Sequence, residues 1–243
     1  MKTMMKSICL VAGMLVASVA SAQTTEEILA KHEAAMGGAD KWASVKTAVV
    51  KNKFNVQGMD IESKTSLVVG KSFRTEIEVM GNKIITVIDG DKGWMNRPAM
   101  MGGTGSPEDM PSDQVKMASS QKNLGSILTN AKKDGYKIEL VSKEKLDGAD
   151  VYLLTVTKPS GEDSKVYVST ATNFVVKTQA KVNMNGQEVD SEVNFSNYKM
   201  VNGLAFPHTV ETPSPMGGTM TVETVSVEIN PTIDPVIFAK PSK

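Results

Sequence analysis

Cysteine, histidine and arginine are scarce in this sequence of 243 residues, and each scarcity excludes a class of site. The one cysteine, Cys9, lies in a leader-like segment, so the rest of the chain has no disulfide, no thiol nucleophile and no cysteine-based metal site. The two histidines, His32 and His208, are far apart and lack a motif such as H-E-x-x-H, so we expect no metal and no cofactor. The formal net charge is zero, which argues against a nucleic-acid partner.

The first 22 residues have the pattern of a secretory signal peptide. Two lysines precede an apolar run over Ile8–Val19, and the small residues A-S-A at 20–22 form a cleavage site. The run is too short for a stable membrane span. We therefore expect residues 1–22 to be removed on export and residues 23–243 to form a single domain outside the cytoplasm. No cysteine follows the cleavage point, so we expect no lipid anchor.

Two segments have helical patterns. The first starts with Thr24 and Glu27, which are spaced as a capping box, and it ends before a Gly-Gly pair. His32 lies on its apolar face, which predicts a packed histidine rather than a ligand. The second helical stretch covers residues 111–131, with Gly125 as a weak point.

Elsewhere the apolar residues alternate with polar ones, which is typical of strands, and three hairpins are predicted. Asn185-Gly186 is the strongest turn signal, and its register gives these facing pairs: Val182 with Val189, Thr178 with Val193, and Val176 with Phe195. A turn at Gly58-Met59 gives two more pairs: Val56 with Ile61, and Val50 with Leu67. The third hairpin runs from Phe73 to Asp89 around Gly81-Asn82.

Five further strand-like runs bring the expected total to about 11: residues 137–145, 150–158, 164–170, 204–211 and 219–229. This spacing favours a mainly β sandwich or barrel with helical cover. Aromatic residues make up only 5% of the chain, so bulky core residues are scarce. An incompletely filled concave face would leave an apolar cavity for a small molecule. The alternative is a core filled by Leu, Val and Met.

Catalytic motifs are missing from the sequence. There is no G-x-S-x-G elbow, and Glu76 and Glu78 alternate with apolar residues, so they belong to a solvated strand face. Without a nucleophile–base pair we expect no enzyme. Arg74 shares the same polar face, where it forms either a surface ion pair with Glu76 or a polar latch to a loop.

Residues 89–105, D-G-D-K-G-W-M-N-R-P-A-M-M-G-G-T-G, combine soft apolar residues with glycine. The segment is too rich in glycine and proline for a helix or a strand. Methionine side chains adapt to apolar ligands of varying shape, so we interpret the segment as a movable gate at the mouth of a cavity. The alternative is a surface loop of permissive residues.

Five stretches in order resemble the outer-membrane lipoprotein-sorting-protein-like family, and its Bacteroidota-type members most: ILAKHEAAMGGADKWASVKT, SFRTEIEVMGNKIITVIDGDKGWM, LDGADVYLLTV, GLAFPHTVE and IDPVIFAKP. The resemblance covers the sequence after the signal. It implies a LolA-like fold, an unclosed and strongly curved antiparallel β-barrel with helices over an apolar concave face. It also implies a lid that is held by a strand arginine, for which Arg74 is the nearest candidate.

The same resemblance implies a periplasmic carrier of acylated molecules, above all lipoproteins in transit to the outer membrane. Its partners would be acyl chains, an inner-membrane release complex and an outer-membrane acceptor, and we expect a monomer. Other proteins with this fold are envelope-stress regulators, so an interaction or sensory module without lipid cargo stays an alternative. The residues expected to contact the ligand are Trp94, Met95, Met100, Met101, Val50, Phe54, Val56, Leu67, Val176, Val193 and Phe195.

Overall fold

The computed structural model describes most of the chain, in five stretches: residues 23–56, 58–131, 133–184, 187–214 and 217–241. The expected signal peptide and the Asn185-Gly186 turn lie outside these residues. No helix in the described stretches has the length and apolar character needed to span a membrane.

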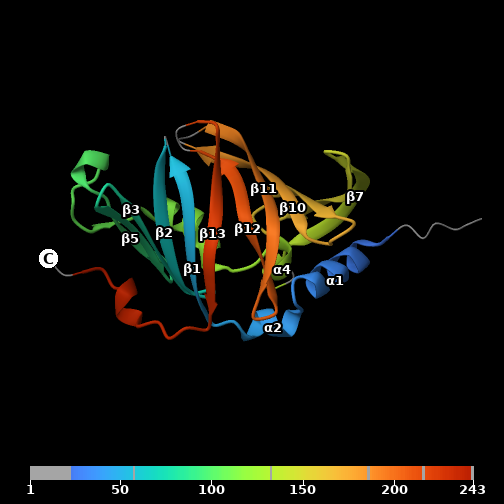
Figure 1. The fold of residues 1–243 in the computed structure, drawn as a ribbon, viewed down its shortest axis with the longest axis horizontal. Helices are drawn as coiled ribbons and strands as arrows, with labels where there is room; N and C mark the ends of the chain where they lie inside the picture. Colours follow the sequence, from blue (N-terminus) through green and yellow to red (C-terminus); the bar gives the residue numbers. More distant parts are fainter. Residues whose placement is uncertain (1–22, 57, 132, 185–186, 215–216, 242–243) are drawn as a thin grey trace, which may run out of the picture.

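A single antiparallel sheet of 13 strands dominates the structure (Figure 1). The strands are β1 Thr47–Val56, β2 Met59–Val68, β3 Ser72–Val79, β4 Asn82–Asp89, β5 Lys92–Asn96, β6 Glu108–Asp109, β7 Lys137–Leu146, β8 Ala149–Thr157, β9 Asp163–Ser169, β10 Val175–Met184, β11 Gln187–Val201, β12 Leu204–Pro213 and β13 Thr219–Ile229. Their spatial order is β6-β5-β4-β3-β2-β1-β13-β12-β11-β10-β9-β8-β7. The edge strands β6 and β7 do not pair, so the predicted unclosed, curved sheet is confirmed.

Two strands exceed the expected number: β5 lies within the predicted gate, residues 89–105, and β6 follows it. β5 pairs with β4, and Trp94 of β5 faces Val87 while Met95 faces Thr86. The two-residue strand β6 then pairs with β5. The prediction that residues 89–105 contain no strand was wrong, because neighbouring backbone can recruit a stretch too short to show alternation.

The hairpin registers agree with the predictions in part. In β10–β11, Thr178 faces Val193 and Val182 faces Val189, as predicted. In β1–β2, Val56 faces Met59 rather than Ile61, so the predicted register was wrong by two residues. A slip of two preserves the face of every side chain, because side chains alternate with period two.

The helices are α1 Thr25–Ala35, α2 Ala39–Ser44, α3 Ser112–Ala118, α4 Ile127–Ala131 and the 3₁₀ helices η1 Ala99–Met101, η2 Ser119–Lys122 and η3 Pro235–Phe238. The four α-helices cover one face of the sheet, which we call the inner face, whereas η3 packs on the opposite, outer face. The capping box of α1 is present, with bonds between Thr24 and Glu27 of 3.2 and 3.3 Å.

The chain passes from one sheet edge to the other across the inner face, through α3, η2 and α4. Val115 of α3 packs on Phe73 and Leu67, whereas Leu128 of α4 packs on Leu154 and Ile28. Residues 112–131 therefore form a cover, which we call the lid, over the middle of the sheet.

Candidate functional site

A cavity of about 470 Å³ lies between the inner face and the lid. Its wall on the sheet side comes from the central strands β1, β13, β12, β11, β10 and β9. The lining residues are Met36, Val50, Asn52, Asn123, Leu124, Gly125, Ser126, Ile127, Ser164, Val175, Thr178, Ala180, Phe195, Tyr198, Phe206, Pro207, Val210, Val222, Thr224 and Val227. The wall is thus largely apolar, with amide and hydroxyl groups in between.

The lid side of the cavity is a break between two helices. η2 ends at Lys122 and α4 begins at Ile127, and the four residues between them all line the cavity. Gly125 has φ of +94°, a left-handed conformation that favours glycine. The sequence indicated this interruption through Gly125, but not that the break would face a cavity.

His32 connects the lid to the rest of the molecule. Its Nδ1 lies 2.8 Å from the carbonyl oxygen of Asn173, and its Nε2 lies 2.7 Å from Oγ of Ser126. A carbonyl only accepts, so Nδ1 carries the proton and Nε2 accepts from the Ser126 hydroxyl. The side chain of His32 is 2% exposed, and this burial lowers its pKa. The neutral ring therefore joins α1, the lid and the β9–β10 turn.

This contact also brings together a serine and a histidine that are 94 positions apart. No sequence spacing could have indicated the pair. The Ser126 hydroxyl also caps α4, because it accepts a hydrogen bond from the backbone N–H of Thr129 at 3.2 Å. The backbone N–H of Ser126 in turn donates to Oγ1 of Thr129.

The apolar residues of β1, β2, β10 and β11 that were predicted to bind the ligand divide into three groups. Val50 and Phe195 line the cavity. On the same face but outside the cavity lining are four others: Phe54, Val56, Leu67 and Val193. Val176 is different, because a bulge at β10 places it against the outer-face cluster of Val151, Leu153 and Tyr167. Their roles in binding stay predictions.

The three methionines of the expected gate do not line the cavity. Met95 is half-buried on the inner face, opposite Thr86. Met100 is 70% exposed, and its sulfur accepts from the side chain of Asn82 at 3.5 Å. Met101 follows it in η1. The contact with Asn82 places Met100 beside the β3–β4 turn.

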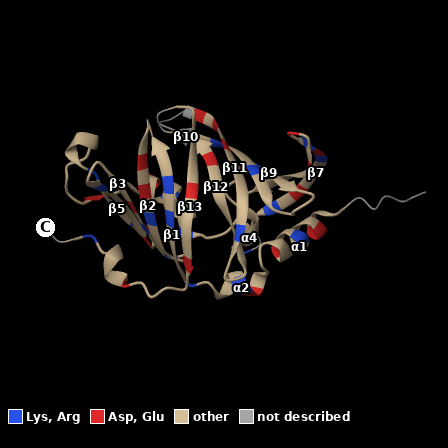
Figure 2. Cartoon of the chain, viewed as in Figure 1, with Lys and Arg blue, Asp and Glu red and all other residues tan. Residues whose placement is uncertain are grey.

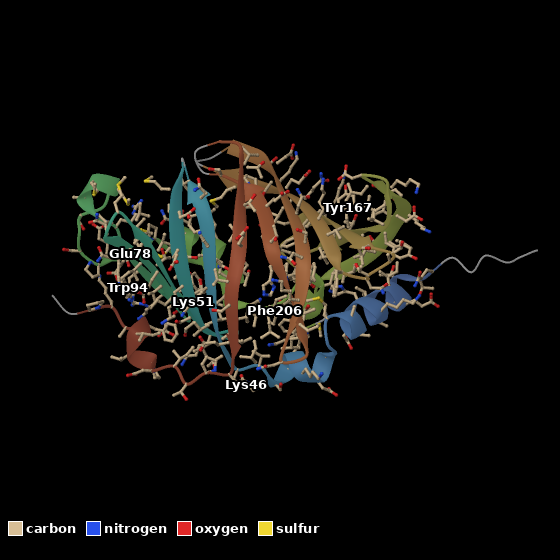
Figure 3. All side chains as sticks on the ribbon, in the orientation of Figure 1. Lys46, Lys51, Glu78, Trp94, Tyr167 and Phe206 are labelled. Atoms are coloured by element: carbon tan, nitrogen blue, oxygen red, sulfur yellow. The ribbon has the colours of Figure 1, made fainter. Side chains whose placement is uncertain are left out.

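Trp94 lies on the face of the sheet opposite to the cavity. It packs with Val87 of the neighbouring strand and with Phe238, and its Nε1 donates to the carbonyl oxygen of Phe238 at 2.9 Å. Figure 3 shows Trp94 and the cavity residue Phe206 in separate parts of the molecule. The expected position of Trp94 in the cavity is thus corrected. Strand alternation sends Met95 inward and so Trp94 outward.

Arg74 bonds to a nearby residue of its own strand and to the C-terminal end of the chain, and its role as a lid latch stays a prediction. Its Nε donates to Glu76 at 2.7 Å, and its Nη1 donates to the carbonyl oxygen of Ile237 at 2.8 Å. The guanidinium lies 5.7 Å from the centre of the Trp94 ring. Arg74 therefore fixes residues 230–241, which we call the C-terminal strap, against the outer face, where Figure 1 shows them beside β3 and β5.

Charged side chains are absent from the cavity lining within the described residues. Many of them lie on the outer face, where β1 carries lysines, β13 carries glutamates and β2 carries both signs (Figure 2). Lys53 and Asp60 pair at 2.9 Å, and this contact lowers the pKa of Asp60. The described residues also contain no group of three or more His, Cys, Asp and Glu side chains that could hold a metal ion.

Comparisons with protein-family models and with curated protein sequences gave no match. Solved structures do match over nearly the whole chain. A LolA superfamily protein from Nitrosomonas europaea is 14% identical, with a TM-score of 0.57, over 90% of this chain and 99% of its own. A domain assigned to outer membrane lipoprotein sorting, from Vibrio parahaemolyticus, is 15% identical, with a TM-score of 0.53, over 88% and 95%.

A third structure, a DUF1329 family protein from Desulfovibrio piger, is 14% identical, with a TM-score of 0.55, over 87% of this chain and 97% of its own. At these identities the comparison concerns the backbone architecture alone. The backbone of this chain follows that of the three structures over nearly their whole length. The chain therefore has a LolA-like fold.

Proposed function

We propose that this protein is a periplasmic carrier that holds acylated molecules, with lipoproteins as cargo, in the cavity under the lid. The observation that carries the proposal is the cavity itself, which has about 470 Å³ of space and a largely apolar wall. Burying each methylene of an acyl chain contributes about 0.8 kcal/mol, so one chain suffices for tight binding. The fold shared with a domain assigned to outer membrane lipoprotein sorting supports the same function.

Native mass spectrometry of the protein purified from its own host tests the proposal directly. We expect an adduct with the mass of an acyl-containing molecule. Ala180 lines the cavity, so Ala180→Phe should fill the space and remove the adduct. Val225 is 63% exposed on the outer face, and Val225→Phe is a matched control that should keep the adduct.

The opposite result would favour an interaction module in place of a carrier. A protein that shows no adduct, and that also fails to take up an added acyl lipopeptide, does not carry acyl chains. A search for a protein partner in the cell envelope would then be the next step.

A second candidate function, hydrolysis of an acyl ester, is favoured by the contact between Ser126 and His32. His32 is in the tautomer that a general base needs, and Ser126 lines the cavity. Against this stands the use of the serine hydroxyl as the cap of α4. Incubation with a monoacylglycerol distinguishes the two functions: a carrier returns the ester intact, whereas an esterase releases fatty acid and loses this activity in Ser126→Ala.

A further inference from the structure

The absence of charge in the cavity restricts what it can hold. The twenty lining residues, all described, include no Asp, Glu, Lys, Arg or His. Their one ionisable group is the Tyr198 hydroxyl, which donates to the carbonyl oxygen of Val175 at 2.8 Å, and burial raises its pKa. A carboxylate or phosphate in this space would lose its hydration without gaining a counter-charge, which is strongly unfavourable.

The volume of the cavity restricts the size of the occupant. A water molecule has about 30 Å³ of liquid volume and a methylene group is of similar size, so 470 Å³ has room for on the order of fifteen such groups. This is the bulk of one long acyl chain. Two or three chains would require a much larger opening of the lid.

Asn52 gives the cavity a polar group that the protein does not use. It lies on β1 between Thr224 of β13 and Ser63 of β2, on the same face as Val50. Thr224 donates its hydroxyl to the carbonyl oxygen of Pro207. Within the described chain, by contrast, the side-chain amide of Asn52 has no hydrogen-bond partner. Its two N–H groups and its oxygen are free for a ligand.

The opposite wall has the same character. Thr178 of β10 lines the cavity and also makes no side-chain hydrogen bond with any described residue. Uncharged donors and acceptors thus line a largely apolar space. They match an ester, an amide or an alcohol, each of which exchanges neutral hydrogen bonds.

We propose that the cavity binds one acyl chain at a time, joined to an uncharged ester, amide or alcohol group that hydrogen-bonds to Asn52. The proposal rests on the carrier function proposed above and specifies its ligand. The recognised chemistry is common to a neutral monoacyl lipid and to the acyl linkage of a lipopeptide. Free fatty acids are discriminated against by their charge.

Competition with a fluorescent acyl probe, at about pH 8, tests the preference with two ligands of one chain length. Palmitate is ionised at this pH, whereas methyl palmitate is neutral. We expect methyl palmitate to bind at least about tenfold more tightly. A monopalmitoyl lipopeptide and monopalmitoylglycerol, run in parallel, show which source of the acyl group is preferred. Native mass spectrometry should give one ligand per protein.

Variants at Asn52 test the proposed hydrogen bond. Asn52→Leu should weaken binding of methyl palmitate about three- to tenfold, which is the effect of one neutral hydrogen bond. Asn52→Lys should reverse the preference toward palmitate, because it supplies the missing cation. Lys51→Leu, on the outer face, is the control and should change neither affinity. Thermal unfolding of each variant shows whether it is folded.

The outcomes separate this inference from the carrier function. Equal or tighter binding of palmitate, or an Asn52→Leu variant with unchanged affinity for methyl palmitate, overturns the specificity and leaves the carrier in place. Binding of two or more acyl chains per protein overturns the one-chain limit. If none of the ligands displaces the probe and the probe itself does not bind, the carrier function fails and this inference fails with it.

Discussion

One imidazole ring, that of His32, holds three separate segments together. The ring is neutral in the folded protein, because burial opposes its charged form more strongly than the Asn173 carbonyl and the nearby Glu33 favour it. In the unfolded chain the pKa returns to about its usual value of 6.5. The unfolded state therefore binds a proton at a higher pH than the folded state does.

This difference predicts a pH dependence with a definite sign. Stability should be complete above about pH 6.5 and should fall as the pH decreases through the lower pKa of the folded state. Through this one group the free energy of unfolding should change by at most about 1.4 kcal/mol per pH unit. Urea unfolding of the protein and of His32→Gln between about pH 7 and pH 5 measures it.

The comparison with His32→Gln isolates the histidine. The carboxyl groups with lowered pKa values, Asp60, Asp150 and Glu192, have usual values of 3.8 to 4.5, so they act at lower pH. A variant that keeps the full slope between about pH 7 and pH 5 would show that His32 is not its source.

Trp94 is the second residue whose role is decided by its surroundings. It is 5% exposed, and it packs under the C-terminal strap. Trp94→Ala should lower the free energy of unfolding by about 3–5 kcal/mol, as expected for a large buried aromatic. Chemical denaturation measures the loss. A Trp94→Ala variant of normal stability that binds acyl ligands poorly would instead indicate that Trp94 contributes to ligand binding in the cavity.

At the scale of elements, the corner between α1 and α2 is closely fitted to the sheet. Met36 accepts hydrogen bonds from Ala205 of β12 and from the indole of Trp42. Gly37, with φ of +109°, approaches the β11–β12 turn so closely that an added Cβ would overlap the carbonyl oxygen of Gly203. Gly38 has φ of +92° but open space around it.

These two glycines form a matched pair for mutagenesis. Gly38→Ala should cost about 1–2 kcal/mol of stability through its left-handed backbone alone. Gly37→Ala should lower the stability by about 1–3 kcal/mol more than Gly38→Ala does, because the overlap forces the corner away from the sheet. Thermal or urea unfolding ranks them. Equal losses in the two variants would mean that the corner moves freely.

The elements also show where sequence-based prediction reached its limit. The capping box of α1 and two of the facing pairs in β10–β11 depend on residues close in sequence, and these predictions are confirmed. The turn between β1 and β2 was misplaced by one residue, because apolar residues on both strands fit either register. The strap was not predicted, because its contacts join Arg74 to Ile237, and no local pattern records such a pairing.

At the candidate site, too, local sequence patterns predicted which residues share a face but not which residues meet across the sheet. Val50 and Phe195 were placed correctly on the inner face by alternation. Asn52 was overlooked, since a polar residue in a strand reads as solvent-facing until the neighbouring strands are known. The lid break at Gly125 was visible as a weakness in a helix, but its place over a cavity depends on the whole sheet.

For the molecule as a whole, the separation of charge from the cavity has a measurable effect. All charged side chains of the described residues lie outside the cavity lining, and the chain has no net charge. We expect the affinity for a neutral acyl ligand to stay within about twofold between about 0.05 M and 0.5 M sodium chloride. Probe titration at the two salt concentrations checks this. A steep loss of affinity would indicate an ionic contact with the ligand.

The strand order also determines how such a molecule can be assembled. β1 and β13 are neighbours at the middle of the sheet, although they stand near opposite ends of the chain. Strands β1–β6 and β7–β13 are two runs of local hairpins, and each run can form early because its loops are short. The join between them needs both ends of the chain, so it comes late. Until then each half has an unpaired strand at its open edge, which is a site for mistaken pairing with another chain. A chain with this strand order is thus most vulnerable to aggregation in the interval before its last strand pairs.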